Sequence, residues 1–181
     1  MIRAFLGLEL PADIRSQLAG AQAGLPAGRA VEPEMLHITL AFLGELRETV
    51  IDDLHLALED LDAPAFALSL AGAGLFGGER PRSLHARVTP DPTLKHLRSK
   101  VLTAARACAI DLPRERYVPH VTLARFPREM PPEDIIAVEA FAARRMSLRA
   151  GPFQVSAFTL FRSHLRSLGA IYEPLADYAL G

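Results

Sequence analysis

Two copies of one four-residue pattern lie far apart in this chain: His-Ile-Thr-Leu at His37–Leu40 and His-Val-Thr-Leu at His120–Leu123. Each copy sits inside an apolar run, MLHITLAFLG or YVPHVTLARF, which is typical of a β-strand. Because side chains alternate between the two faces of a strand, the histidine and the threonine of each copy share one face. Each strand is therefore expected to present an imidazole and a hydroxyl together, backed by an apolar layer.

The sequence before each copy also repeats. An apolar segment that ends in proline precedes both motifs: RAFLGLELP (Arg3–Pro11) and RSLHARVTP (Arg82–Pro90). A helix-like segment follows each proline, and the motif histidine lies 26 positions after Pro11 in the first copy and 30 positions after Pro90 in the second. The sequence thus predicts a duplicated unit of strand, helix and His-x-Thr strand. Two such units would pack as pseudo-symmetric lobes, with both histidines at their junction.

The rest of the chain alternates between helix and strand patterns. Proline or acidic starts and helical apolar spacing predict helices near 11–24, 45–61, 91–109 and 131–145. The expected strands lie at 2–10, at the first motif as far as Gly44, and at 66–76, 82–90, 117–126, 153–163 and 168–177. Seven strands and four helices in mixed order favour an α+β fold with antiparallel sheets and outer helices.

Length and composition bound the class of protein. With 181 residues, 50% of them hydrophobic, the chain can bury the core of one domain over residues 1–181. No apolar stretch reaches the roughly 20 residues that cross a bilayer, and the N-terminal residues lack a signal-peptide pattern, so a cytoplasmic protein without membrane contact is expected. Cys108 is the only cysteine, which argues against a disulfide or a thiolate metal cluster.

The net charge of −1 hides an asymmetry. Residues 1–79 carry 4 basic and 12 acidic side chains, whereas residues 80–181 carry 16 basic and 9 acidic ones. The second half is therefore a candidate phosphate-binding side, although charged residues also cover ordinary solvated faces. Eighteen of the 20 cations are arginines, which suits two-pronged contact with phosphate.

Two histidines in one cleft can move two protons in one reaction. An imidazole has an ordinary pKa near about 6.5, so one can be neutral and the other protonated. In phosphodiester hydrolysis one would take a proton from water and the other would protonate the departing oxygen, while threonine hydroxyls would bind the phosphate oxygens. A metal site, two buried core histidines and a binding module without turnover are the alternatives. No other His, Cys or Asp stands at a spacing that completes a metal site.

The paired motifs resemble the two-histidine phosphoesterase superfamily, in particular the bacterial and archaeal RNA 2′,3′-cyclic phosphodiesterases, also called the 2′-5′ RNA ligase family. The likeness follows the family's order over nearly the whole chain, in IRAFLGLELP, HITLAFLGEL, LFGGERPRSL, PHVTLARF and LFRSHLRSLGAIYEPL. It implies two pseudo-symmetric lobes, each an antiparallel sheet with outer helices, and an active-site cleft between them. It also implies opening of a terminal 2′,3′-cyclic phosphate on RNA to a 2′-phosphomonoester, without metal or cofactor.

The resemblance assigns roles to individual residues. His37 would be the proton donor to the leaving 3′ oxygen, and His120 the proton acceptor that activates water. Thr39 and Thr122 would bind phosphate. Phe5 matches an aromatic residue of the family's first strand and could stack on a base or simply fill the core.

Two positions do not fit this pattern smoothly. Arg125 matches an arginine that would meet phosphate, but its offset of five from His120 would place it on the other face of a regular strand. His85 stands where the family often has a tryptophan, and the chain has no tryptophan.

The resemblance also defines the expected partners. They are RNA ends with a 2′,3′-cyclic phosphate, tRNA halves among them, bound by a monomer that can also catalyse the reverse 2′-5′ ligation. An RNA-end or nucleotide-binding module with vestigial catalysis is one alternative. A two-histidine esterase for small cyclic phosphates or 2′-5′ oligonucleotides is another.

Overall fold

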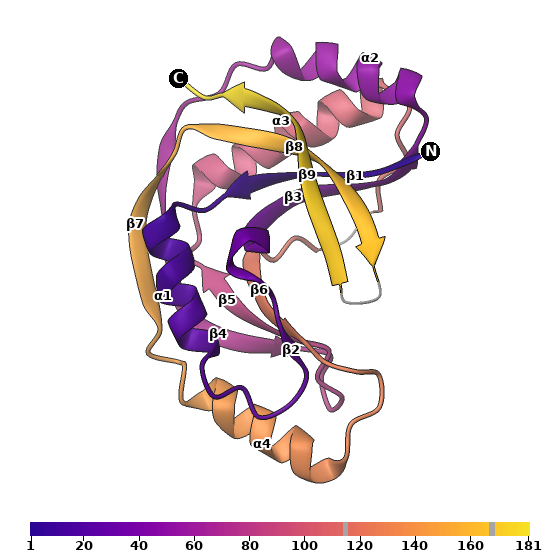
Figure 1. The fold of residues 1–181 in the computed structure, drawn as a ribbon. Coiled ribbons are helices and arrows are strands. Elements are labelled where there is room, and N and C mark those ends of the chain that lie inside the picture. Colours follow the sequence, from indigo (N-terminus) through magenta and orange to yellow (C-terminus); the bar gives the residue numbers. More distant parts are fainter. Residues whose placement is uncertain (114–115, 167–168) are drawn as a thin grey trace.

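The computed structural model describes residues 1–113, 116–166 and 169–181. Strands and helices alternate along most of the chain, which ends in three consecutive strands (Figure 1). In chain order they are β1 (Ile2–Glu9), α1 (Ala12–Gln22), β2 (Arg29–Ala30), the 3₁₀ helix η1 (Pro33–Met35), β3 (His37–Leu46), α2 (Glu48–Glu59), β4 (Phe66–Phe76), β5 (Ser83–Val88), α3 (Pro92–Ala107), β6 (His120–Arg125), α4 (Pro132–Ala143), β7 (Arg149–Val155), β8 (Ala157–Arg166) and β9 (Gly169–Ala179). No helix in the described ranges is long and apolar enough to cross a membrane.

The strands form two antiparallel halves that meet at the His-x-Thr motifs. Their order is β7-β4-β5-β6-β3-β1-β8-β9, with β2 beside β6. Between the halves, β3 and β6 pair only through Ile38 and Val121. Helices α2 and α3 lie along the half that contains β3, and α1 and α4 lie along the half that contains β6 (Figure 1). The expected α+β fold with two lobes and outer helices is confirmed.

The strand pairing follows the duplicated unit. β1 pairs with β3 in the first unit, and β5 pairs with β6 in the second. After the first unit the chain crosses to the other half, where β4 pairs with β5. After the second unit β7 stays in its own half beside β4, and β8 then crosses over to pair with β1. The chain therefore crosses between the halves after α2 and again between β7 and β8, and the pair of Ile38 with Val121 joins the two halves into one sheet.

The first His-x-Thr strand contains a β-bulge directly after its threonine. β1 pairs with Thr39 and then with Ala41, so Leu40 has no partner in β1. Leu40–Ala41 are both buried and the next residue, Phe42, is exposed. Arg98 Nε donates to the carbonyl of Leu40 at 3.0 Å, which satisfies an oxygen at the bulge. The bulge therefore returns Phe42 to the face of the sheet that carries His37.

The second motif has the same bulge at the equivalent position. β5 pairs with Thr122 and then with Ala124, so Leu123 has no partner in β5. The carbonyl of Leu123 accepts hydrogen bonds from Gln22 Nε2 at 2.8 Å and from the backbone of Val31 at 2.8 Å. Leu123–Ala124 are buried and Arg125 is exposed. The expectation that Arg125 points away from the histidine face holds only for a regular strand, and the bulge reverses it.

Three strand boundaries differ from the sequence-based expectation. β3 does not end at Gly44, because the glycine takes a left-handed backbone (φ 76°) at a second register shift and the strand continues to Leu46. The expected strand 153–163 is interrupted at Ser156, so its two parts form β7, beside β4, and β8, beside β1. β6 begins at His120 and not at residue 117, directly after Pro119, which has no backbone N–H to donate.

Candidate active site

The single pair between the halves brings the two motifs side by side. Because β3 and β6 run antiparallel, the residue before Ile38 lies beside the residue after Val121, and the residue after Ile38 lies beside the residue before Val121. His37 is thus adjacent to Thr122, and Thr39 to His120. Ile38 and Val121 are fully buried, so the polar side chains share the opposite face.

Both imidazoles are held in the same way by the backbone. His37 Nδ1 lies 2.8 Å from the carbonyl oxygen of Met35, and His120 Nδ1 lies 2.7 Å from that of Val118. A carbonyl oxygen can only accept, so in each ring Nδ1 carries the hydrogen and donates it. Nε2 of each neutral ring is then free to accept a proton. In His37 this nitrogen is 3.1 Å from Thr39 Oγ1, whose hydroxyl donates to it.

The surroundings favour the neutral form of both rings in the free protein. Burial lowers the pKa of His37 from 6.5 to about 4, opposed by the carbonyl of Met35 and assisted by the charges of Arg125 and His120. Burial also lowers the pKa of His120, opposed by the carbonyl of Val118 and assisted by Arg125. The Arg125 guanidinium is thus close enough to act on both histidines, and a bound phosphate anion would reverse its effect by favouring their protonated forms.

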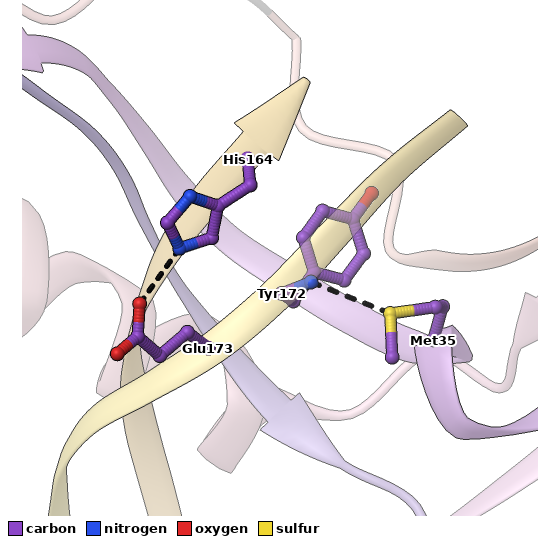
Figure 2. Close-up of polar contacts among 4 residues, drawn as sticks. All are labelled: Met35, His164, Tyr172 and Glu173. Carbon is purple, nitrogen blue, oxygen red and sulfur yellow. Dashed lines mark hydrogen bonds and ion pairs between the residues drawn. The ribbon is translucent and has the colours of Figure 1, made fainter. Parts of the chain in front are cut away.

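Phe5 is 2% exposed, so its ring packs in the core, which is the second of the two roles expected for it. There it supports the catalytic candidate His37, with the two ring centroids 4.8 Å apart. Tyr172 contacts the same imidazole edge-on at 4.9 Å. Figure 2 shows how Tyr172 is held: its backbone N–H donates to the sulfur of Met35 at 3.4 Å. The position of the His37 ring is therefore fixed by aromatic rings from β1 and β9 and by its hydrogen bond to the carbonyl of Met35.

An aromatic pocket adjoins the histidine pair, and the sequence did not identify its residues. The cavity measures about 220 Å³ and is bordered by Thr39 and His120. Its other lining residues are mainly apolar or aromatic, with two arginines: Leu40, Ala41, Phe42, Phe76, Arg98, Leu102, Leu112, Pro113, Arg116, Tyr117 and Val118. Phe42 is 65% exposed there. Phe42 lies five residues after His37, as Arg125 does after His120. This equal spacing is the sequence signal that could have indicated that Phe42 belongs to the site.

His85 packs beside the pair as an aromatic ring would. It is 4% exposed, and its ring stacks on Phe76 with centroids 3.9 Å apart. The edge of His120 meets it at 5.4 Å. Its Nδ1 is buried without a hydrogen-bond partner among the described residues, and burial lowers its pKa to about 4.

Replacing His85 by phenylalanine is expected to leave the protein equally stable or to stabilise it by about 1 kcal/mol. The phenyl ring keeps the stack on Phe76 and removes a buried polar atom that lacks a partner. His85→Ala, which opens a cavity against Phe76, should instead be destabilising by about 2–3 kcal/mol. Urea unfolding at pH 7 measures both, and a large loss in His85→Phe would show that Nδ1 has a partner in solution.

Comparisons with known proteins agree with this geometry. The sequence model of the 2′-5′ RNA ligase superfamily matches residues 9–166. The RNA 2′,3′-cyclic phosphodiesterase of Thermus thermophilus is 32% identical over 99% of this chain and 90% of its own length. That of Geobacillus stearothermophilus is 31% identical over 97% of this chain, which spans 56% of that relative's length.

The crystal structure of E. coli LigT complexed with 3′-AMP has the same fold, with a TM-score of 0.78 and 28% identity over 99% of this chain and 98% of that one. The match to the sequence model covers most of the chain and therefore shows its family. The chain belongs to the 2′-5′ RNA ligase superfamily.

Proposed function

We propose that the protein hydrolyses terminal 2′,3′-cyclic phosphates of RNA to 2′-phosphomonoesters. The observation that carries this proposal is the matched pair of imidazoles, each with Nδ1–H donated to a backbone carbonyl and Nε2 left for proton transfer. Relatives at about 30% identity carry the name RNA 2′,3′-cyclic phosphodiesterase, which supports the same activity here. The complex of E. coli LigT with 3′-AMP supports a nucleotide as the ligand.

In the proposed reaction the two histidines have opposite roles. His120 Nε2 accepts a proton from water as the water oxygen bonds to phosphorus. The bond between phosphorus and the 3′ oxygen breaks, and protonated His37 delivers its Nε2 proton to that oxygen. The products are a 2′-phosphate and a 3′-hydroxyl. In 2′-5′ ligation a 5′-hydroxyl of a second RNA would take the place of water, with His120 as the base and His37 as the acid. The two residues would exchange roles in the reverse reaction, cleavage of the 2′-5′ linkage, because each step must run backwards through the same proton transfers.

The remaining polar groups would stabilise the phosphate as its charge redistributes. Thr39 and Thr122 hydroxyls donate to the non-bridging oxygens, and the Arg125 guanidinium supplies positive charge. Since the histidines move both protons and these groups hold the charge, we propose that the reaction needs no metal ion.

The pH dependence of kcat/KM is expected to be bell-shaped with an acidic optimum. Catalysis requires protonated His37 and neutral His120. In the free protein the pKa of His37 is about 4 and burial also lowers the pKa of His120, so the product of the two required fractions is largest at acidic pH. Stopped assays from pH 4 to 8 measure it, and an optimum above pH 7 would contradict the assignment.

Stability must be followed over the same pH range. A histidine whose pKa is lowered by folding binds its proton more readily in the unfolded chain, so the fold loses stability as the pH falls from about 6.5 to 4. Thermal unfolding at each pH separates this loss from the titration of catalytic groups.

A panel of substrates tests the proposed function against its alternatives. We expect turnover of a short RNA ending in a 2′,3′-cyclic phosphate with a higher kcat/KM than for a 2′-5′ linked dinucleotide or a small non-nucleotide cyclic phosphate. Tight binding of a 2′-phosphorylated RNA without hydrolysis of any substrate would favour a binding module. Preference for the small cyclic phosphate would favour the other esterase class.

A further inference from the structure

Two arginines face each other across strands at one end of the histidine face. Arg29 of β2 pairs directly with Arg125 of β6. Directly opposite residues of an antiparallel pair project to the same face, so two positive charges lie side by side, an arrangement that costs stability unless something compensates it. Both side chains are exposed, and within the described ranges neither forms an ion pair with an acid. An anion between them would remove this repulsion.

The two guanidinium groups line a small pocket, here called the arginine pocket. It measures about 80 Å³, and its wall also contains Met35 and Tyr172. These two residues contact His37 through a backbone hydrogen bond and a ring edge. Figure 2 shows that these two lining residues contact each other, through the backbone N–H of Tyr172 and the sulfur of Met35. Glu32 is the one acidic side chain of the lining, and it is exposed.

The backbone around Arg29 is shaped to bring it close to β6. Gly28 has φ 77°, and a Cβ atom there would lie 2.6 Å from the carbonyl oxygen of Arg125 and 2.4 Å from the ring of Phe126. Only glycine allows this approach. On the other side, a Cβ at Gly169 would lie 2.8 Å from the Arg29 guanidinium. Two glycines therefore leave the space in which Arg29 lies against β9.

The position of this pocket indicates which anion it would take. Along β6 the sequence runs from His120, at the aromatic pocket, through Thr122 to Arg125. At roughly 3.3 Å per residue, Arg125 is at most about 10 Å from Thr122. This limit exceeds the spacing of successive phosphates along an RNA strand, so one strand can reach both positions. The scissile phosphate at the threonines and a second phosphate at the arginines would then belong to one strand.

We propose that the arginine pocket binds the phosphodiester on the 5′ side of the terminal nucleotide, so that the site selects an RNA strand over a mononucleotide. The proposal rests on the proposed function. It adds Arg29 as a substrate-binding residue and a second phosphate as a group that the site recognises. Arg29 can donate two hydrogen bonds to that group. Arg125 has five N–H donors, enough to reach this phosphodiester as well as the scissile phosphate, and the two positive charges favour an anion over a neutral ligand.

The test compares two substrates that differ by one nucleotide, and thus by one phosphodiester and one nucleoside. Adenosine 2′,3′-cyclic phosphate lacks the second phosphate, and the dinucleotide ApA ending in a 2′,3′-cyclic phosphate carries it. For the unmodified protein we expect kcat/KM to be about tenfold higher for the dinucleotide. Arg29→Ala should remove this advantage while changing the mononucleotide rate less than twofold. The slope of log(kcat/KM) against log[salt] should also become shallower by about 1 for the dinucleotide.

Controls separate the second phosphate from general effects. A dinucleotide with a neutral methylphosphonate linkage should behave like the mononucleotide with the unmodified protein. Arg144→Ala, which removes an exposed arginine beyond α4, should keep the dinucleotide advantage. Equal losses on both substrates in Arg29→Ala, or an unchanged ratio, would overturn the proposal.

A binding measurement distinguishes failure of the arginine-pocket proposal from failure of the proposed function. If the unmodified protein hydrolyses neither substrate, calorimetry with 2′-AMP and with ApA ending in a 2′-phosphate still measures the second phosphate. About tenfold tighter binding of the dinucleotide, lost in Arg29→Ala, supports the arginine pocket without catalysis. Equal affinities for the two ligands overturn it.

Discussion

His120→Ala is expected to lower kcat/KM for an RNA 2′,3′-cyclic phosphate by about 10²–10⁴-fold, the range for loss of a general base. Water would then have to attack without transfer of its proton to the protein. The loss should appear mainly in kcat, because the threonines and Arg125 remain to bind phosphate.

The control for this variant is His96→Ala, which removes an exposed histidine of α3 and should keep full activity. Circular dichroism and thermal unfolding check that both variants fold. Activity within threefold of the unmodified protein in folded His120→Ala would remove His120 from the mechanism.

His37→Ala is expected to cause a loss of similar size for a different reason. The 3′ oxygen is a poor leaving group, and without His37 it would depart as an alkoxide. A p-nitrophenyl phosphodiester needs little help from an acid, so on that substrate His37→Ala should lose much less than His120→Ala. Measured rates of both variants on both substrates give a two-by-two comparison that assigns acid and base.

The alanine variant also removes a ring that packs between Phe5 and Tyr172, so its fold needs a second check. His37→Asn keeps an amide that can donate to the carbonyl of Met35. If His37→Asn folds normally and loses activity on RNA as the alanine variant does, the loss comes from the missing acid. Equal losses of the two histidine variants on the p-nitrophenyl ester would contradict the assignment of roles.

Much of the fold could be predicted because the chain repeats itself. A strand, a proline-started helix and a His-x-Thr strand occur twice, and duplicated units with the same apolar faces must bury them in the same way. Alternation within the motifs also placed the histidine and threonine of each copy on one face. The pairing of Ile38 with Val121 agrees with the expected junction of the lobes.

The face on which a side chain lies was harder to predict where the backbone departs from regular alternation. The bulges at Leu40 and Leu123 leave no mark in the hydrophobic pattern, yet they decide that Phe42 and Arg125 lie on the histidine face. Periodicity alone assigned Arg125 to the wrong face. Carbonyl oxygens at the bulges are satisfied by Arg98 and Gln22, side chains that are distant in sequence.

Burial was equally hard to predict for Phe5. An aromatic residue in a strand suits either a core or a stacking surface, and the choice depends on β8 and β9 at the other end of the chain. Phe161 stacks on Phe5 with ring centroids 4.9 Å apart, and Tyr172 meets it at 4.8 Å. These contacts assign to Phe5 the support of His37, which no local pattern indicated.

The most direct test of the central claim is to identify the product formed from a short RNA with a 2′,3′-cyclic phosphate in the presence of EDTA. Phosphorus NMR distinguishes the cyclic ester, the 2′-phosphate and the 3′-phosphate. Complete conversion to the 2′-phosphate would show that the 3′ oxygen leaves and that the two histidines suffice without a metal ion. Formation of the 3′-phosphate, or turnover that stops with EDTA and returns with added metal, would contradict the account.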